Sequence, residues 1–281
     1  MPLDQIADEK EMSFLDHLEE LRWHLIRSLL AVLVIAVAAF LSKELVFNTI
    51  ILGPSRGDFW TFKMLCKLAG FINSDGLCIN ELPFILQSRK PTGQFTMHLT
   101  SSFVIGIIVA FPYAFWEIWR FIKPGLYPRE RKAARGATFW VSLLFLMGVV
   151  FGYFIITPIS LNFLSNYQLD ASIVNEFDII SYVSLVCTLV LSCALLFQLP
   201  VVVFFLTKAD LITPALMKKY RRHAIVVILI LGAMLTPPDP FSQILIALPL
   251  LALYQISIYI SKRVEKRERK KQLIEANKNK T

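Results

Sequence analysis

The sequence has few charged residues within its apolar runs and lacks the motifs that usually carry catalysis. It contains no GxxxxGK[ST], HExxH or GxSxG pattern, so nothing points to nucleotide, zinc or serine-hydrolase chemistry. Its four cysteines include no pair with metal-site spacing, and we expect no cofactor and no enzymatic activity. No basic patch is interleaved with stacking aromatics in a polar domain, so we also expect no nucleic-acid partner.

Apolar residues, in contrast, are abundant. Of the 281 residues 56% are hydrophobic, whereas about 45–50% is typical of soluble domains. Apolar runs of about 20 residues recur, as transmembrane helices require. We therefore expect an all-α polytopic membrane protein, a cupped bundle of six transmembrane helices with a long extracytoplasmic loop at about 48–94. Residues 1–22 are expected to form a cytoplasmic amphipathic helix, 23–261 the membrane domain and 262–281 a basic cytoplasmic tail.

The last two predicted spans are short. The fifth is about 12 residues long, which is too short for a normal bilayer, so the pair forms either a re-entrant element or two short helices across a thinned membrane. The third span holds Gly148 and Gly152 at GxxxG spacing, which is typical of a helix-packing notch. The six predicted spans are about 23–47, 96–121, 137–161, 179–206, 224–235 and 244–260.

The orientation in the membrane follows from Lys and Arg in the loops. Basic residues gather around Lys123 and Lys208 and in the tail, whereas the short loops around Asp170 and Asp239 carry none. By the positive-inside rule, both termini are then cytoplasmic.

The first predicted helix carries acidic residues where it passes from water into the membrane. Asp16, Glu19 and Glu20 crowd its first turns, although membrane helices usually carry basic residues at the cytoplasmic side. Two interpretations stay open at this point. The acids form a solvated face favoured by the helix N-terminus, or they form a docking site for a cationic ligand.

Two polar side chains in the predicted spans have candidate partners. Glu117 is near a cytoplasmic helix end and can pair with Arg120 at i,i+3. Gln198 lies deep in the fourth span, where it makes an interhelical hydrogen bond, worth about 0.6 kcal/mol, or contacts a polar residue on a partner's transmembrane helix. The four histidines are expected to be isolated residues at span boundaries: His17, His24, His98 and His223.

The cysteines fall into two pairs. Cys187 and Cys193 lie inside an apolar run and are expected to be small buried apolar residues. Cys66 and Cys78 are predicted to lie outside the cytoplasm, where two alternatives stay open. They form a disulfide that closes a loop of about 13 residues, worth about 3 kcal/mol in the chain-entropy model, or they remain two thiols.

Three motifs occur in a fixed order along the chain and together carry a resemblance. With them, the region from about Ser13 to Ile260 resembles the TatC family, the multi-span receptor subunit of the twin-arginine translocation system. The motifs are Phe14-Leu15-Asp16-His17-Leu18-Glu19-Glu20-Leu21-Arg22, then Phe121-Ile122-Lys123-Pro124-Gly125-Leu126-Tyr127 with Glu130-Arg131, and finally Leu235-Thr236-Pro237-Pro238-Asp239-Pro240-Phe241-Ser242-Gln243.

The resemblance implies a receptor in the cytoplasmic membrane of a bacterium that binds Arg-Arg signal peptides of folded proteins. It also implies self-association, and export with TatA-like and TatB-like single-span partners driven by the proton-motive force. The family's two signal-binding glutamates fall on Glu20 and Glu130, which favours the docking interpretation of the acidic helix. Four further family positions are matched at the same site: Arg22, Phe121, Pro124 and Tyr127.

The resemblance also assigns partner positions. Met234 and Leu235 fall in the short fifth helix, where the family docks its TatB-like partner, and Asp239 and Gln243 belong to the last motif. Gln198 stands where many members have a glutamate, so an acid is not required there in this chain. The alternative function is a secondary transporter of a small solute, but such proteins usually show repeats and midplane charges, which this sequence does not show.

Overall fold

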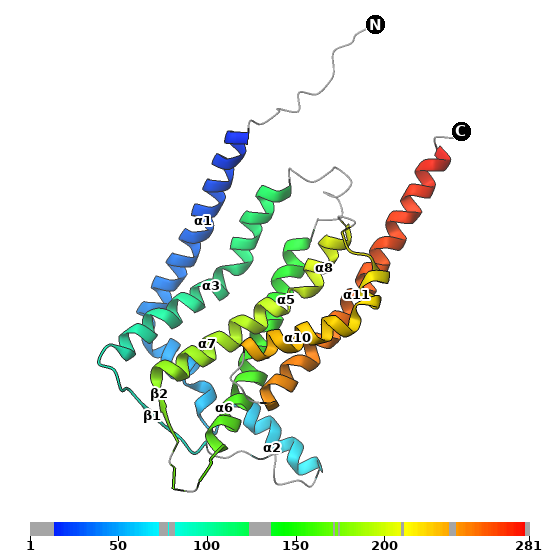
Figure 1. Ribbon diagram of the computed structural model, residues 1–281. Coiled ribbons are helices and arrows are strands. Elements are labelled where there is room, and N and C mark those ends of the chain that lie inside the picture. The colour runs from blue at the N-terminus through cyan, green and yellow to red at the C-terminus, as the bar shows by residue number, and fades with distance from the viewer. Residues whose placement is uncertain are drawn as a thin grey trace.

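The computed structural model describes residues 14–72, 78, 82–123, 136–170, 172–173, 175–208, 211–235 and 240–278. These residues form a bundle of helices with a small pair of strands at one end (Figure 1). The elements, in chain order, are α1 (Phe14–Leu41), η1 (Leu45–Ile51), η2 (Gly53–Ser55), α2 (Trp60–Ile72), β1 (Ile85–Gln87), α3 (Gly93–Ile122), α5 (Ala137–Phe151), η5 (Gly152–Ile156), α6 (Thr157–Asn166), β2 (Glu176–Asp178), α7 (Ile179–Leu196), α8 (Leu199–Lys208), α9 (Pro214–Lys219), α10 (Arg221–Leu235) and α11 (Pro240–Lys278).

Within the described ranges, five helical segments are long and apolar enough to cross a membrane. They coincide with five of the six predicted spans. In the remaining one, α10 has 15 residues, which at 1.5 Å per residue is about 22 Å and shorter than the ~30 Å hydrocarbon core. A sixth crossing therefore stays a prediction. The five segments are Leu18–Leu41, Gly93–Ile122, Thr138–Asn166, Ile179–Lys208 and Gln243–Arg267.

Close helix approaches occur where small residues meet. A Cβ on Gly148 would lie 2.7 Å from Cα of Ala194, and one on Gly152 would lie 3.0 Å from Cα of Val190. The GxxxG pair is thus the packing notch that the sequence predicts, and it seats α5 and η5 on α7. Gly106 has the same role between α3 and α1, since its Cβ would lie 2.8 Å from the carbonyl oxygen of Val32.

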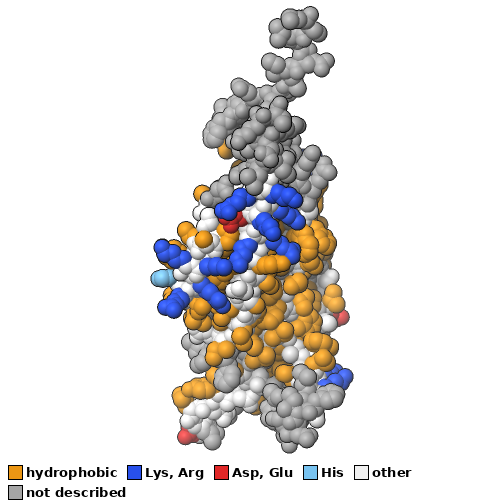
Figure 2. Space-filling view, turned by 90° about the vertical axis from the view of Figure 1, so that its right-hand side faces the viewer, with side chains coloured by type: hydrophobic (Ala, Val, Ile, Leu, Met, Phe, Trp, Pro, Cys, Tyr) orange, Lys and Arg blue, Asp and Glu red, His pale blue; other side chains and the backbone are white. Residues whose placement is uncertain are grey.

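The two ends of the bundle differ. At the end that we call the basic end, α1 and α5 begin and α3 and α11 end, as Figure 1 shows at the top. Figure 2 shows Lys and Arg side chains gathered toward this end, above an apolar surface. Exposed members of this basic group lie on α9, α10 and α11: Lys218, Lys219, Arg221, Arg222, Lys262 and Arg263.

The opposite end, which we call the strand end, corrects the all-α prediction in one detail. Ile85–Gln87 pairs in parallel with Glu176–Asp178, in the register Ile85 to Glu176. Strands of three residues separated by about a third of the chain give no periodic signal in the sequence, so pattern analysis could not find them. At the same end, the stretch predicted as a long loop at about 48–94 contains the helix α2, and a disulfide joins Cys66 to Cys78.

Candidate functional site

Glu20 lies on the second turn of α1 at the basic end. Its side chain is 40% exposed, and Arg22 two residues later is exposed as well. Leu18, Leu21 and Leu25 flank these residues on the same helix and are also exposed, Leu25 to 60%. The first turns of α1 therefore present an acid and an apolar stripe that no described part of the chain covers.

Behind Glu20, a polar cluster is buried between α1 and α3. Nδ1 of His24 lies 2.5 Å from Oε2 of Glu117, although the two residues are 93 positions apart in the sequence. The hydroxyl of Tyr113 donates to Oε1 of Glu117 at 3.0 Å. His24 is 6% exposed and Glu117 is 2% exposed. Both oxygens of this buried carboxyl group are thus occupied, as burial of a charged or polar group requires.

This cluster corrects two predictions from the sequence. Glu117 does not pair with Arg120, because it faces α1 while the Arg120 guanidinium lies over the ring of Trp116, 5.8 Å from its centroid. His24 is not an isolated boundary histidine, since it contacts Glu117 and lies 4.0 Å from Glu20 through Nε2. One signal could have found it. His24 follows Glu20 at i,i+4, on the same helix face.

The other predicted signal-binding residues lie at or beyond the end of α3. Phe121 is half-buried, and its ring centroid is 6.2 Å from that of His24. Pro124, Tyr127 and Glu130 lie outside the described residues. The structure therefore places Glu20, Arg22 and Phe121 at the basic end, and the segment that carries Glu130 joins α3 to α5 at that same end.

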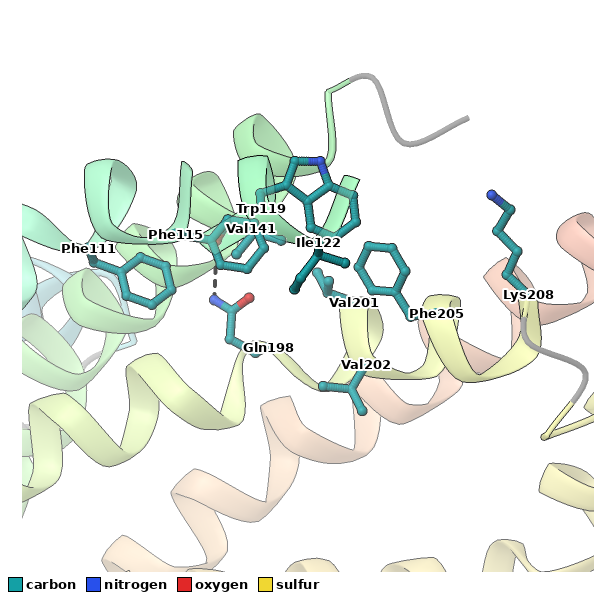
Figure 3. A pocket seen from close by; sticks show the side chains of 10 residues that line it. All are labelled: Phe111, Phe115, Trp119, Ile122, Val141, Gln198, Val201, Val202, Phe205 and Lys208. Carbon is teal, nitrogen blue, oxygen red and sulfur yellow. Dashed lines mark hydrogen bonds between the residues drawn. The ribbon is translucent and has the colours of Figure 1, made fainter. Parts of the chain in front are cut away.

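An apolar groove of about 600 Å³ lies beside this region, between α3, α5 and α8 (Figure 3). Four side chains of α3 form one wall, and residues from α8 form the other. Gln198, at the junction of α7 and α8, is the uncharged polar side chain in this lining. The lining residues are Phe111, Phe115, Trp119, Ile122, Val141, Gln198, Val201, Val202, Phe205 and Lys208.

The two ends of the Gln198 amide have different surroundings. Nε2 donates to the carbonyl oxygen of Val141 at 3.2 Å, the bond drawn in Figure 3. Oε1 is buried and has no hydrogen-bond partner among the described residues. The interhelical hydrogen bond that the sequence suggests is therefore present, while the acceptor remains available beside the groove.

The predicted partner region is described in part. Met234 and Leu235 end α10, and the structure describes their backbone but not their side chains. Asp239 lies outside the described residues, whereas Gln243 donates through Nε2 to the carbonyl oxygen of Leu229 at 3.3 Å. This bond ties the start of α11 to α10.

The arrangement of these residues defines a class of protein. No group of three or more His, Cys, Asp and Glu side chains in the described ranges could hold a metal ion. What these residues form is a multi-span helical membrane protein with an exposed acid beside leucines and an apolar groove, both of which suit the binding of other chains. The chain belongs to the TatC family, since the family model described as Sec-independent protein translocase protein (TatC) matches residues 16–249.

Relatives and solved structures agree with this membership. The chain is 39% identical over 263 residues to a TatC of Blattabacterium, covering 93% of this chain and 99% of the relative. It is 33% identical over 254 residues to a TatC of Listeria innocua, covering 90% and 92%. A crystal structure of the twin-arginine translocase receptor TatC matches with a TM-score of 0.64 at 30% identity, covering 89% of this chain and 99% of that chain. A second one, in DDM, gives 0.67 at 32% identity and covers 87% and 99%.

Proposed function

We propose that this protein is the receptor subunit of a twin-arginine translocase, which binds the Arg-Arg signal peptides of folded proteins. Membership of the TatC family favours this function over transport of a small solute. The export step would use TatA-like and TatB-like single-span partners and the proton-motive force in a bacterial cytoplasmic membrane, where the receptor self-associates.

The basic end is, in this proposal, the cytoplasmic one. Exposed Lys and Arg residues on α9, α10 and the end of α11 gather there, and cytoplasmic flanks of membrane helices carry such an excess. The disulfide between Cys66 and Cys78 lies at the opposite end, and disulfides persist in oxidising compartments. Both observations support a bundle with its two termini in the cytoplasm.

The observation that carries the proposal is the exposure of Glu20 next to exposed leucines on the first turns of α1. A signal peptide has a basic region followed by an apolar one, and this surface offers an acid to the first and leucines to the second. In this proposal Glu130, which lies in the sequence between α3 and α5, binds the second arginine. Arg suits this role because its planar guanidinium binds carboxylates through paired hydrogen bonds.

Partner helices are proposed to bind at two further places. Gln198 offers an unpaired acceptor beside the apolar groove, which suits a polar residue on a TatA-like transmembrane helix. Met234 and Leu235 lie at the end of the short α10, where a TatB-like helix would dock.

The test is crosslinking of a signal peptide to the receptor in membranes. The Arg-Arg peptide should crosslink and a Lys-Lys version should not. Glu20→Ala and Glu130→Ala should each weaken binding by about ten- to a hundredfold, because a charge-assisted hydrogen bond contributes about 1.5–3 kcal/mol. Glu20→Gln should be nearly as weak, since a neutral amide cannot replace the carboxylate.

Glu44→Ala is the matched control, because Glu44 is an exposed acid beyond the other end of α1. It should bind the Arg-Arg peptide normally. Protein level and trypsin resistance report folding in every variant. Native crosslinking in both Glu20→Ala and Glu130→Ala would show that the acids form only a solvated face.

A further inference from the structure

His24 occupies the junction of three groups that belong to the proposed signal site or lie directly behind it. Nδ1 faces Glu117 at 2.5 Å, Nε2 faces Glu20 at 4.0 Å, and the imidazole ring lies beside Phe121 at 6.2 Å between centroids. The ring is buried, so these neighbours and not water set its orientation. The His24 ring thus links a buried carboxyl group on α3 to the exposed Glu20 on α1.

The hydrogen on Nε2 follows from the pairing with Glu117. A buried pair is least costly when its net charge is zero, which requires one proton between Nδ1 and the carboxyl group. If that proton is on Nδ1, the imidazolium carries a hydrogen on both nitrogens. If it is on the carboxyl group, Nδ1 accepts and the hydrogen of the neutral ring is on Nε2. In both forms Nε2 is a donor, and it faces Glu20.

The remaining polar neighbours do not change this result. The hydroxyl of Tyr113 donates to the other oxygen of Glu117, so it does not compete for Nδ1. Arg27 is exposed, and although its charge acts on Glu117, water screens that charge. Glu117 therefore fixes the plane of the His24 ring, as carboxylates beside other functional histidines do.

We propose that His24 is a positioning residue for Glu20: the Glu117–His24 pair presents an N–H donor that holds the Glu20 carboxylate over the α1–α3 seam, next to Phe121. The inference rests on the proposed function, because it concerns the same site. A distance of 4.0 Å is too long for a hydrogen bond, so Nε2 biases the side-chain direction of Glu20 and leaves its oxygens available to a signal arginine.

A purely structural role makes a different prediction. If the pair only clamps α1 to α3, its replacement by two apolar side chains should leave binding intact, since such replacements in buried pairs are often neutral or stabilising. If the pair positions Glu20, the same replacement should fold and yet bind poorly. The double variant His24→Leu/Glu117→Leu separates the two roles.

The experiment measures the affinity of the full-length receptor in nanodiscs for a fluorescent Arg-Arg signal peptide and for its Lys-Lys version. Loss of an orienting partner costs roughly 10- to 100-fold at metal sites, and because Glu20 is partly exposed we expect about tenfold weaker Arg-Arg binding in the double variant. Its thermal stability should equal or exceed that of the parent. Lys-Lys binding should not change.

Two further variants act as rescue and control. Glu117→Gln keeps an acceptor for Tyr113 and a donor for Nδ1, so the hydrogen stays on Nε2 and Arg-Arg affinity should stay within about twofold. Ser28→Ala removes a buried hydroxyl one turn further along α1, which donates to the carbonyl oxygen of His24 at 2.9 Å. It disturbs the same helix interface without touching the pair, and it should bind normally.

The outcomes also separate this inference from the proposed function. If the parent receptor binds both peptides alike, the proposed function is wrong. If the parent discriminates and the double variant retains full Arg-Arg affinity, the positioning role is wrong while the function stands. A second measurement does not depend on folding of a variant: ¹⁵N spectra of the histidine-labelled parent should show His24 with a hydrogen on Nε2, and a bare Nε2 would overturn the inference.

Discussion

Glu117 and Gln198 are both polar side chains inside the helical bundle, and their surroundings satisfy them to different extents. Both oxygens of Glu117 have partners, one on α1 and one on its own helix. Gln198 has a partner for its nitrogen only, and its buried oxygen faces none among the described residues. Glu117 lies in a closed seam between α1 and α3, whereas Gln198 lines an open apolar groove.

This difference distinguishes two roles that buried polar groups can have in a membrane protein. A fully satisfied group fixes one arrangement of the helices and of the residues next to it. An unsatisfied acceptor in an apolar wall carries a cost, because a buried polar group without a hydrogen bond is unfavourable by roughly 1–3 kcal/mol. A partner that donates a hydrogen bond would remove that cost. The seam is therefore suited to position a binding residue, and the groove is suited to receive another chain.

Disruption of the Glu117–His24 pair in the seam should have the largest effect on the free energy of unfolding. Glu117→Leu leaves His24 buried without its partner, and removal of one member of a buried pair costs about 3–5 kcal/mol. Unfolding of the purified protein in detergent would measure this loss. Tyr113→Phe, which removes only the exposed-side hydrogen bond, should cost about 1 kcal/mol. Equal stability of Glu117→Leu and the parent would mean that the seam is not closed as described.

Removal of the disulfide at the strand end tests whether signal-peptide binding at the basic end depends on the opposite end of the bundle. Cys66→Ser/Cys78→Ser should lower stability by about 3 kcal/mol, the chain-entropy value for a loop of this size, and leave Arg-Arg selectivity unchanged. Alkylation of unreduced protein should spare Cys66 and Cys78 until reductant is added. Full labelling without reductant would contradict the disulfide, and altered selectivity would show that the two ends are coupled.

The packing behind the groove is tested at Gly148, where α5 meets α7 close to Gln198. Gly148→Ala would put a Cβ 2.7 Å from Cα of Ala194, and overpacking of this kind costs about 1–3 kcal/mol. Gly70→Ala in α2 is the control, since nothing lies within 4 Å of its Cβ, and removal of a helical glycine there should stabilise by about 0.5–1 kcal/mol. A neutral Gly148→Ala would mean that α5 can move away without loss.

Sequence patterns predicted the features that are local or periodic. Apolar runs located five of the six predicted spans, and two glycines four residues apart located the contact between α5 and α7. Pairings distant in the sequence were missed. His24 and Glu117 are 93 positions apart, and the i,i+3 spacing of Glu117 and Arg120 indicated the wrong partner, because Glu117 faces the neighbouring helix α1.

The candidate site was found through motifs and not through periodicity. The family resemblance singled out Glu20, because the acids alone fit a solvated face equally well. It could not assign His24, since nothing in the motif shows that this residue lies between Glu20 and a buried carboxyl group. The unpaired oxygen of Gln198 could be predicted in part, because a side-chain amide on an apolar helix needs a hydrogen-bond donor, an acceptor or both.

Gln198→Leu should have the smallest effect on stability and a specific effect on assembly. The variant loses a bond to Val141 worth about 0.6 kcal/mol, but it also removes a buried oxygen without a partner, so stability should change by less than about 1 kcal/mol. Assembly with a TatA-like helix should weaken roughly threefold, which corresponds to one such hydrogen bond. Crosslinking between the two proteins in membranes measures it.

Two companion variants show whether the acceptor oxygen is what matters at this position. Gln198→Glu keeps an acceptor in the same place and should assemble normally. Ser142→Ala removes another buried oxygen that has no partner in the described chain, but Ser142 does not line the groove, so assembly should again be normal. If Gln198→Leu assembles and exports cargo at the native rate, the unpaired oxygen of Gln198 does not bind a partner helix. The contrast between the closed seam and the open groove would then describe only how tightly the two places are packed.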